Sequence, residues 1–299
     1  LRGHTMKITL LGTGTPTPST RRAGSSFLVR TGTETFLFDC GPGSHVRMLE
    51  AGISPTQVTQ LFVSHWHYDH FTDLPHLLLR RWDQGAGKLP ELKVYGPEPV
   101  RGIMEKLFGA DGVFDPDLRA RTESELSVAI YEARGGIRPR LRPRPEVAEL
   151  RPETAVEGAG WTVRTIETPH AQPHLRSLAY RLETAEGMFV YSGDSGPTPR
   201  MAPFARGADV LVHMCHYLTG SQLDPGMLQG CGSHRMVAEV ARDAGVKTLV
   251  LTHITEQMDV PGVRERAIHE ISSIFPGNVI WGEDLLSFAP GEIRPAKLL

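Results

Sequence analysis

The sequence contains little cysteine, and the few cysteines that it has form an odd number. Only Cys40, Cys215 and Cys231 occur in 299 residues. A sparse and odd set argues against the disulfide framework that holds small secreted domains together. A chain of this length with 40% hydrophobic residues buries enough apolar surface to fold without such crosslinks. We therefore expect a reducing cytoplasm, and we expect Cys40 to be a small buried residue rather than a ligand or a nucleophile.

The chain also lacks a large net charge and a long apolar run. Its 32 basic and 34 acidic residues give a net charge of −2, so no global positive field draws it to nucleic acid or to a membrane. No apolar run reaches the roughly 18 residues of a membrane-spanning helix. The residues before Met6 contain no apolar signal-peptide core. We expect residues 1–5 to be a remnant of expression and Met6 to be the natural start.

Four side chains of metal-ligand type lie within six residues of one another. An apolar run from Leu61 to Val63 predicts a buried strand, and His65, His67, Asp69 and His70 follow it. Imidazole and carboxylate bind divalent transition metals, with zinc the default. Neighbouring side chains diverge, so the four cannot all reach one tetrahedral ion, but alternate residues can converge. His65 and His67 therefore suit one metal ion, and Asp69 and His70 suit a second ion a few Å away.

Further along the chain, four predicted apolar strands each end in a histidine or an aspartate. The residues at these ends are His170, Asp194, His213 with His216, and His253. Ligand sites in layered α/β folds gather where strands end, because the loops there can converge on one point. Four such endings beside the histidine loop favour a metal centre over separate histidines of the core.

The motif from His65 to His70, HWHYDH, resembles the signature of the metallo-β-lactamase superfamily. The resemblance covers nearly the whole chain. It implies an α/β fold, the four-layer αβ/βα sandwich, in which two mixed sheets face each other, helices lie outside and metals lie at one edge. It also implies a single metallo-hydrolase domain over residues 6–299. The least matched part, residues 109–160, is expected to be an insertion or cap.

The resemblance also implies which side chains bind the metals. The first ion would be bound by His65, His67 and His170, the second by Asp69, His70 and His253, and both by Asp194. His174 competes with His170 for the third position of the first site. Asp69 is expected to serve catalysis as well as metal binding. Two divalent ions, zinc by default with manganese or iron as alternatives, would hold a bridging hydroxide as the nucleophile.

Further residues are expected around the metals. In the family, an aspartate in the position of Asp39 supports the ligands, although Asp39 could equally be a turn residue. Thr13 lies in a Gly-Thr-Gly loop that borders the site in the family, and His213 and His216 are expected to line the pocket. His234, at the start of a predicted amphipathic helix, is a candidate proton donor to the leaving group, with helix capping as the alternative.

One substitution and one unusual segment bear on the substrate. Ribonuclease Z, a branch of the superfamily, has a glutamate where this chain has Met214, which puts tRNA 3′ processing in doubt without affecting hydrolysis itself. The segment from Arg134 to Pro145 has five arginines spaced by prolines, which predicts an extended chain rather than a helix. It is either a solvated linker or a cap loop that draws an anionic substrate towards the metals.

The leading hypothesis is a dinuclear metal-dependent hydrolase similar to the ribonuclease Z and arylsulfatase-like branch. Its substrate would be a phosphodiester or related anionic ester, either a small molecule or a nucleotide-type ester, with nucleic acid as a less supported partner. The resemblance alone implies a homodimer. One alternative is a hydrolase of lactones, carboxylic esters or β-lactams, which the same metals could cleave. Another is a non-catalytic member of the superfamily that binds nucleic acid or acts as a scaffold.

Overall fold

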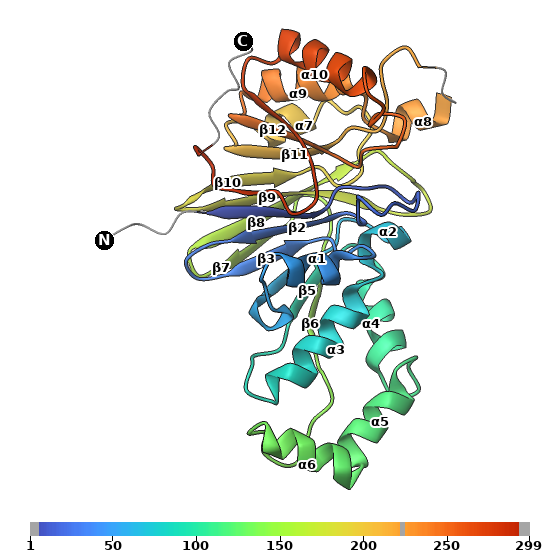
Figure 1. Ribbon diagram of the computed structural model, residues 1–299, viewed down its shortest axis with the longest axis vertical. Helices are drawn as coiled ribbons and strands as arrows, with labels where there is room; N and C mark the ends of the chain where they lie inside the picture. Colours follow the sequence, from blue (N-terminus) through green and yellow to red (C-terminus); the bar gives the residue numbers. More distant parts are fainter. Residues whose placement is uncertain (1–5, 222–224, 293–299) are drawn as a thin grey trace.

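The strands of the computed structural model, which describes residues 6–221 and 225–292, form two facing mixed sheets (Figure 1). Residues 1–5, expected to be an expression remnant, lie outside the described residues. In the described part of the chain each sheet has seven strands. In spatial order the first sheet consists of β14 (Ser287–Phe288), β1 (Lys7–Gly12), β2 (Ser26–Arg30), β3 (Thr35–Phe38), β4 (Gln60–Phe62), β5 (Lys93–Gly96) and β6 (Glu146–Glu149). The second consists of β13 (Asn278–Trp281), β12 (Thr248–Thr252), β11 (Val210–Met214), β10 (Gly187–Tyr191), β9 (Ser177–Thr184), β8 (Trp161–Thr168) and β7 (Ala155–Gly158).

Helices cover the outer faces of both sheets, which confirms the predicted four-layer αβ/βα sandwich (Figure 1). Those of the first half are α1 (Ser44–Glu50), α2 (Tyr68–Phe71), α3 (Leu74–Gly85), α4 (Val100–Phe108), α5 (Asp115–Glu123) and α6 (Glu125–Ala133), with a 3₁₀ turn at Pro55–Gln57. Those of the second half are α7 (Met201–Phe204), α8 (Pro225–Gly230), α9 (His234–Ala244) and α10 (Val263–Ile274). No helix in the described ranges combines the length and the hydrophobicity needed to cross a membrane.

Aromatic residues make up only 7% of the sequence, yet they concentrate between the two sheets. Phe36, Phe38 and Phe62 of the first sheet meet Tyr180 and Phe189 of the second. The ring centroids of Phe38 and Phe189 are 5.1 Å apart, and those of Phe62 and Tyr180 are 5.4 Å apart. Such pairs add about 0.5–1.5 kcal/mol each beyond the area that they bury. This core fixes how the two sheets, and the loops at their ends, lie relative to each other.

The direction of the strands explains why the ligand-type residues meet. β3, β4, β5 and β6 run parallel to one another, and so do β10, β11, β12 and β13. β8 runs antiparallel to β9, which runs antiparallel to β10, so β8 and β10 point the same way. The carboxyl ends of strands that point the same way lie along the same edge of a sheet. The loops after β4, β8, β10 and β12 therefore open at one edge of the sandwich.

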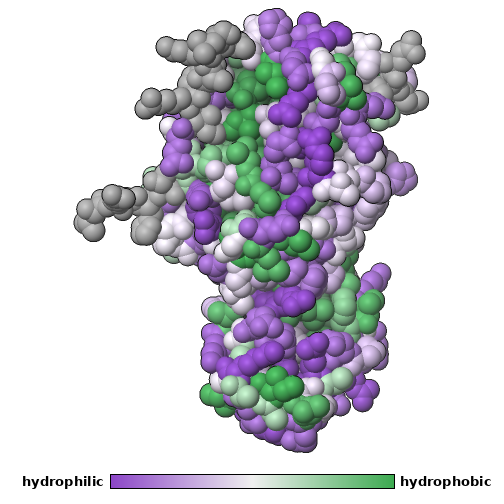
Figure 2. Space-filling model, viewed as in Figure 1, coloured by the Kyte–Doolittle hydropathy of each residue, from purple (hydrophilic) through white to green (hydrophobic). Residues whose placement is uncertain are grey.

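The region 109–160 is more than an appended cap. Its helices α5 and α6 protrude from the sandwich at the lower end of Figure 1, and their surface mixes hydrophilic and hydrophobic residues (Figure 2). The chain from 135 to 145 is neither helix nor strand, as its prolines predict. β6 then forms one edge of the first sheet and β7 one edge of the second. The region therefore supplies a strand to each sheet as well as the protruding helices.

Candidate metal centre

The loop after β4 sends its ligand-type side chains in two directions because its backbone changes conformation. His67 is extended, with ψ 142°. Side chains two residues apart in an extended backbone point to the same side, which brings His65 and His67 together. α2 begins at Tyr68, so Asp69 and His70 lie on a helical turn. The backbone thus divides the four side chains into two pairs.

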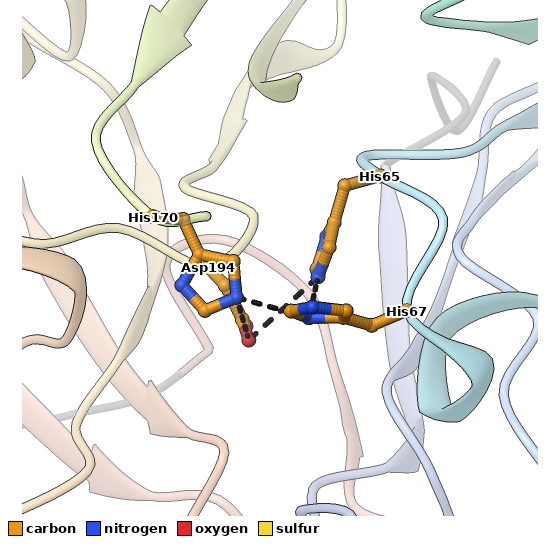
Figure 3. Close-up of side chains that lie close together, drawn as sticks. All are labelled: His65, His67, His170 and Asp194. Atoms are coloured by element: carbon orange, nitrogen blue, oxygen red, sulfur yellow. Dashed lines mark hydrogen bonds and ion pairs between the residues drawn. The ribbon is translucent and has the colours of Figure 1, made fainter. Parts of the chain in front are cut away.

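Figure 3 shows the first group, in which His65 and His67 meet His170 from the loop after β8 and Asp194 from the loop after β10. One ligand atom from each residue lies within 4.8 Å of the other three. His67 Nδ1 lies 3.0 Å from His65 Nε2 and 3.1 Å from His170 Nε2. Asp194 Oδ2 lies 3.5 Å from His170 Nε2 and 3.9 Å from His65 Nε2. His67 therefore turns Nδ1 to the centre, whereas the other two histidines turn Nε2.

The second group consists of Asp69, His70 and His253, the last from the loop after β12. Asp69 Oδ2 lies 3.4 Å from both His70 Nε2 and His253 Nε2. Asp194 Oδ2 also reaches this group, at 3.5 Å from His70 Nε2 and 3.2 Å from His253 Nε2. One oxygen of Asp194 thus lies between the two groups.

Several polar atoms that face this centre are buried without a hydrogen-bond partner. They include His70 Nε2, His253 Nε2 and both carboxylate oxygens of Asp69. Because buried polar atoms are nearly always partnered, such a cluster points to a group that binds all of them. Ligands about 2.0–2.1 Å from a tetrahedral zinc ion lie roughly 3.3–3.4 Å apart. Separations of 3.0–3.9 Å among these atoms fit two divalent ions bound by nitrogen and oxygen.

Asp39 connects the ligand loop to both sheets. It follows β3, is fully buried and has a φ of 59°, in the left-handed region. Its carboxylate accepts hydrogen bonds from Ser64 N at 2.6 Å and Ser64 Oγ at 2.7 Å. Asp39 Oδ2 also lies 2.7 Å from His70 Nδ1 and accepts from the Tyr191 hydroxyl at 2.7 Å. Four donors on one carboxylate fix the ring of His70, and such outer contacts tune a metal centre.

Two further contacts orient histidine rings. His170 Nδ1 donates to the Gly230 carbonyl at 2.8 Å, so its Nε2 is left to face the centre. His65 Nδ1 lies 3.0 Å from Ser64 Oγ, which has the same effect on His65. His174, the alternative to His170 as the third ligand, is exposed in the turn between β8 and β9. Among the described residues it belongs to neither ligand group.

Burial and local charge favour the metal-binding forms of His65, His67 and Asp194. Burial lowers the pKa of His65 well below its usual value, and the neighbouring charge of His70 lowers it further. Burial also lowers the pKa of His67. Burial by itself would raise the pKa of Asp194, but the charges of His253 and His70 outweigh it and hold that pKa well below its usual range. Neutral imidazoles and an ionised carboxylate are the forms that divalent metals bind.

His216 lies beside the second group, with its Nδ1 3.1 Å from His253 Nδ1. Burial and the neighbouring His253 lower its pKa to about 4, so the ring is neutral at pH 7. His213 was expected in the same pocket, but it is fully buried in β11 and its Nδ1 donates to the Met214 carbonyl at 2.9 Å. His213 belongs to neither ligand group among the described residues, and its Nε2 is buried without a hydrogen-bond partner, so its place beside the site stays a prediction.

Thr13 supports the site from behind rather than facing the ligands. Its hydroxyl donates to Asp284 Oδ1 at 2.8 Å and accepts from Arg22 Nη1 at 2.6 Å. Its carbonyl accepts from Ile254 N at 3.0 Å. Because Ile254 follows His253 directly, these bonds hold the backbone of a ligand-type residue against the loop after β1.

His234 does not face the centre, which corrects its assignment as a proton donor. It lies at the start of α9, as predicted, but it is fully buried. Its Nδ1 accepts from Thr219 N at 3.0 Å, and its Nε2 lies 2.9 Å from Glu270 Oε2 of α10. The backbone of Thr219 and the carboxylate of Glu270 therefore occupy both ring nitrogens. The cap of α9 is Ser233, whose side chain accepts from Met236 N.

The sequence did not predict three groups that orient the ligand-type side chains. Ser64 directly precedes the first ligand-type histidine, and Tyr191 lies three residues before Asp194, so their neighbourhood offered a weak signal. The Gly230 carbonyl offered no signal, because every residue type has a backbone carbonyl and the sequence does not indicate which one accepts a hydrogen bond.

Comparison with known proteins defines the class to which this chain belongs. The family model described as "Metallo-beta-lactamase superfamily" matches residues 19–253. The chain is 33% identical to "Ribonuclease Z" of Mycobacterium sp. (strain KMS), over 97% of this chain and 99% of that protein. It is 31% identical to "Ribonuclease Z" of Methanothermobacter thermautotrophicus, over 84% of this chain and 87% of that protein. The chain belongs to the metallo-β-lactamase superfamily.

Solved structures agree with this assignment at the level of the fold. The metallo-beta-lactamase fold protein YhfI from Bacillus subtilis superposes with a TM-score of 0.71 at 20% identity, covering 95% of this chain and 99% of that chain. The short form of human tRNase Z superposes with a TM-score of 0.67 at 22% identity, with the same coverage. Together with the curated relatives, this likeness identifies a metal-dependent hydrolase similar to ribonuclease Z.

Proposed function

We propose that this protein is a dinuclear metal-dependent phosphodiesterase that cleaves RNA. The observation that carries the proposal is the position of Asp194 Oδ2, 3.5 Å from His170 Nε2 in one group and 3.2 Å from His253 Nε2 in the other. An oxygen shared in this way suits a bridging ligand, and two ions about 3.5–4 Å apart are a common arrangement for phosphodiester cleavage. The name ribonuclease Z, carried by relatives at 31–33% identity, supports RNA as the substrate.

The residues of the chain would prepare the reaction by fixing the ligands. When bound, two divalent ions supply the attacking hydroxide, polarise the phosphoryl group and stabilise the leaving oxygen. Asp39 holds the ring of His70, and the Gly230 carbonyl holds the ring of His170. Rings that are fixed beforehand need no reorganisation during the reaction. Zinc is our proposed metal because nitrogen and carboxylate ligands suit it, with manganese or iron as alternatives.

Hydrolysis also requires a proton at the leaving oxygen. Water adds its hydroxyl to phosphorus as the P–O bond breaks, and its proton goes to the oxygen that departs. His216 is our candidate for the hydrogen-bond donor to that oxygen, because it lies beside His253 and has no place in either ligand group. It replaces His234, whose ring nitrogens are both occupied.

The charge of the centre favours an anionic substrate over a neutral one. Two divalent ions bring four positive charges, against one negative charge each on Asp39, Asp69 and Asp194. Before a hydroxide forms, this count leaves one positive charge, which attracts a phosphodiester, whereas a lactone offers no charge to attract. A cavity of about 500 Å³ borders Asp69 and is lined by residues 15–19 and Tyr68. This cavity gives the substrate room beside the second group.

The test measures bound metal and cleavage in the same preparations. Wild type, Asp69→Ala and an exposed control, Asp243→Ala, are incubated with a tRNA precursor, an unrelated RNA, bis-p-nitrophenyl phosphate and a chromogenic lactone. We expect about two ions per chain in wild type and control. Both should cleave RNA and the diester, and Asp69→Ala should lose at least about a hundredfold in rate.

Other outcomes of this test separate the alternatives. Cleavage of the lactone alone would favour the alternative function, a hydrolase of lactones, carboxylic esters or β-lactams. A chain without stoichiometric metal would overturn the proposal and favour a binding or scaffold protein. The tRNA precursor is compared with unrelated RNA because Met214 replaces the glutamate of ribonuclease Z. A cytoplasmic location and a homodimer remain predictions from the sequence.

A further inference from the structure

A second cavity lies in the protruding part of the molecule and shares no residue with the two ligand groups. Its volume is about 800 Å³, and its lining includes Arg101, Met104, Phe108, Arg140, Arg142 and Arg144. α4 begins near the metal loop, where Trp66 Nε1 donates to the Pro97 carbonyl at 3.0 Å. Nine residues of helix then lead about 13 Å away. The arginine cavity, defined by this lining, is thus separate from the metal centre.

Positive charge exceeds negative charge at the arginine cavity. Arg142 pairs with Asp115 at 2.7 Å. Arg101 and Arg144 are exposed and make no ion pair within the described residues. The lining contains four arginines and the acidic residue Glu105. Arginine without a carboxylate partner is the residue that proteins use to bind phosphate.

The fourth arginine, Arg140, is held in place. It is 7% exposed, and its guanidinium lies 4.2 Å from the ring centroid of Trp82 and 5.1 Å from that of Tyr131. Its Nη2 donates to Asp83 at 2.6 Å, while its Nε is buried without a hydrogen-bond partner.

Asp83 cannot neutralise Arg140 alone, because other arginines share it. Arg134 lies 2.9 Å and Arg121 lies 3.4 Å from the same carboxylate. Arg121 also pairs with Asp117 at 2.9 Å, so three guanidinium groups share two carboxylates, which leaves a surplus of positive charge. Since the aromatic rings already fix Arg140, a bound anion would not have to order it, and the entropy cost of binding would be small.

The lining of the arginine cavity also contains apolar side chains. Met104 and Phe108 from α4 are 5% and 6% exposed, and Pro143 and Val147 also belong to the lining. A cavity of this size, lined by both arginines and apolar side chains, is typical of a site for a small ligand with a charged and an apolar part. A phosphate chain attached to a flat ring system has this character.

We propose that the arginine cavity binds a phosphorylated small molecule of nucleotide size, such as a nucleoside diphosphate, at a site remote from the metals. The concave shape and the buried head of Arg140 favour a small ligand over a polymer. A nucleic acid backbone, in contrast, would pair with charges on an exposed convex surface. The inference does not depend on the proposed RNA cleavage, because binding is measured without hydrolysis.

The experiment titrates α,β-methylene-ADP, whose methylene bridge resists cleavage between the phosphates, into the metal-loaded protein by calorimetry. The test variant is Arg101→Ser/Arg144→Ser. Neither side chain makes an ion pair within the described residues, so the substitutions remove none that stabilises the fold. The matched control is Arg119→Ser, an exposed arginine of α5 outside the arginine cavity. A third variant, Asp69→Ala, disrupts the metal centre alone.

We expect one nucleotide per chain in wild type, unchanged affinity in Arg119→Ser and Asp69→Ala, and at least a tenfold weaker affinity in the double variant. Three results would overturn the inference. The first is the absence of saturable binding up to millimolar nucleotide. The second is binding that Asp69→Ala abolishes and the double variant retains, which would locate the nucleotide at the metals. The third is a protein that binds RNA but no nucleotide, with the double variant weakening RNA alone.

Discussion

Tyr191 donates its phenolic hydrogen to Asp39 Oδ2 at 2.7 Å, and this bond joins the two sheets next to the metal-binding groups. Tyr191 ends β10 in the second sheet, whereas Asp39 follows β3 in the first. The same oxygen of Asp39 lies 2.7 Å from His70 Nδ1. The position of His70 therefore depends on how the two sheets meet, and not only on its own loop.

Replacing Tyr191 by phenylalanine tests this dependence. Tyr191→Phe keeps the ring in the core and removes one donor from a buried carboxylate. A hydrogen bond to a charged group contributes about 1.5–3 kcal/mol, so the free energy of unfolding should fall by that amount. Because Asp39 then orients His70 less firmly, metal affinity should fall about tenfold. Urea denaturation and competition with a chelator measure the two quantities.

The matched control is Tyr180→Phe. Tyr180 is equally buried between the sheets, but its hydroxyl donates to the Val63 carbonyl at 2.6 Å and not to Asp39. This variant should lose stability and keep its metal affinity. An equal loss of metal affinity in both variants would contradict the role given to the Tyr191–Asp39 bond.

The four-layer fold and the full ligand set were expected from the resemblance to the metallo-β-lactamase superfamily, whereas local pattern predicted the strand ends and the two pairs in the loop from His65 to His70. Apolar runs that end in His or Asp indicate strand ends, and strands that point the same way put those ends along one edge. The spacing of His65, His67, Asp69 and His70 predicts two pairs because neighbouring side chains diverge, and in the structure an extended stretch followed by a helical turn separates these pairs. Every inference from local pattern uses residues only a few positions apart.

Contacts between distant parts of the chain could not be predicted. Asp39 and Tyr191 are 152 positions apart, and no periodicity relates them. The sequence correctly places His234 at a helix start, but the direction of its ring depends on Glu270, which reaches it only when α9 packs on α10. The full burial of His213 likewise follows from the packing around β11, which its neighbours in the sequence do not reveal.

Substitutions of single ligands should separate the two metal sites. His67→Ala should lose about one ion per chain and His253→Ala the other, because each residue belongs to one group. Asp194→Ala should reduce both, since its Oδ2 lies between the groups. His269→Ala, an exposed position on α10, is the control that should retain both ions. Elemental analysis after dialysis measures the content, and an Asp194→Ala protein that keeps two ions would rule out a bridging carboxylate.

The contact between His216 and His253 predicts different effects for two substitutions of His216. If His253 holds a metal through Nε2, its proton would stay on Nδ1 and be donated to His216 Nδ1, 3.1 Å away. His216→Asn keeps an acceptor near that position, so it should keep metal affinity while losing rate through the missing ring nitrogen. His216→Phe has no acceptor, so metal affinity should fall several-fold as well. Equal metal affinity in the two variants, measured by chelator competition, would argue against this hydrogen bond.

The stability of the metal-free protein should depend on pH through His213. Burial lowers the pKa of His213 to about 4, because a charged ring in the core would be poorly solvated and its Nε2 has no partner. In the unfolded chain the same ring titrates near about 6.5. As pH falls from about 6.5 to 4, the unfolded state therefore takes up the proton first, and the free energy of unfolding should fall by about 3 kcal/mol in all. Above about pH 6.5 the ring is neutral in both states and contributes no slope.

The variant His213→Leu isolates this contribution from the other acid-sensitive groups. It loses the bond from Nδ1 to the Met214 carbonyl and so costs stability at every pH, but it has no proton to bind. Its unfolding free energy, measured in urea between pH 7 and 4.5, should therefore fall less steeply than that of wild type. His269→Leu, an exposed position on α10, should keep the wild-type slope. Metal-free protein is needed because acid also releases ions, which destabilises in the same direction. Parallel curves for wild type and His213→Leu would show that the acid sensitivity arises elsewhere. In that case the ring of His213 would bind the same number of protons in the folded and the unfolded state.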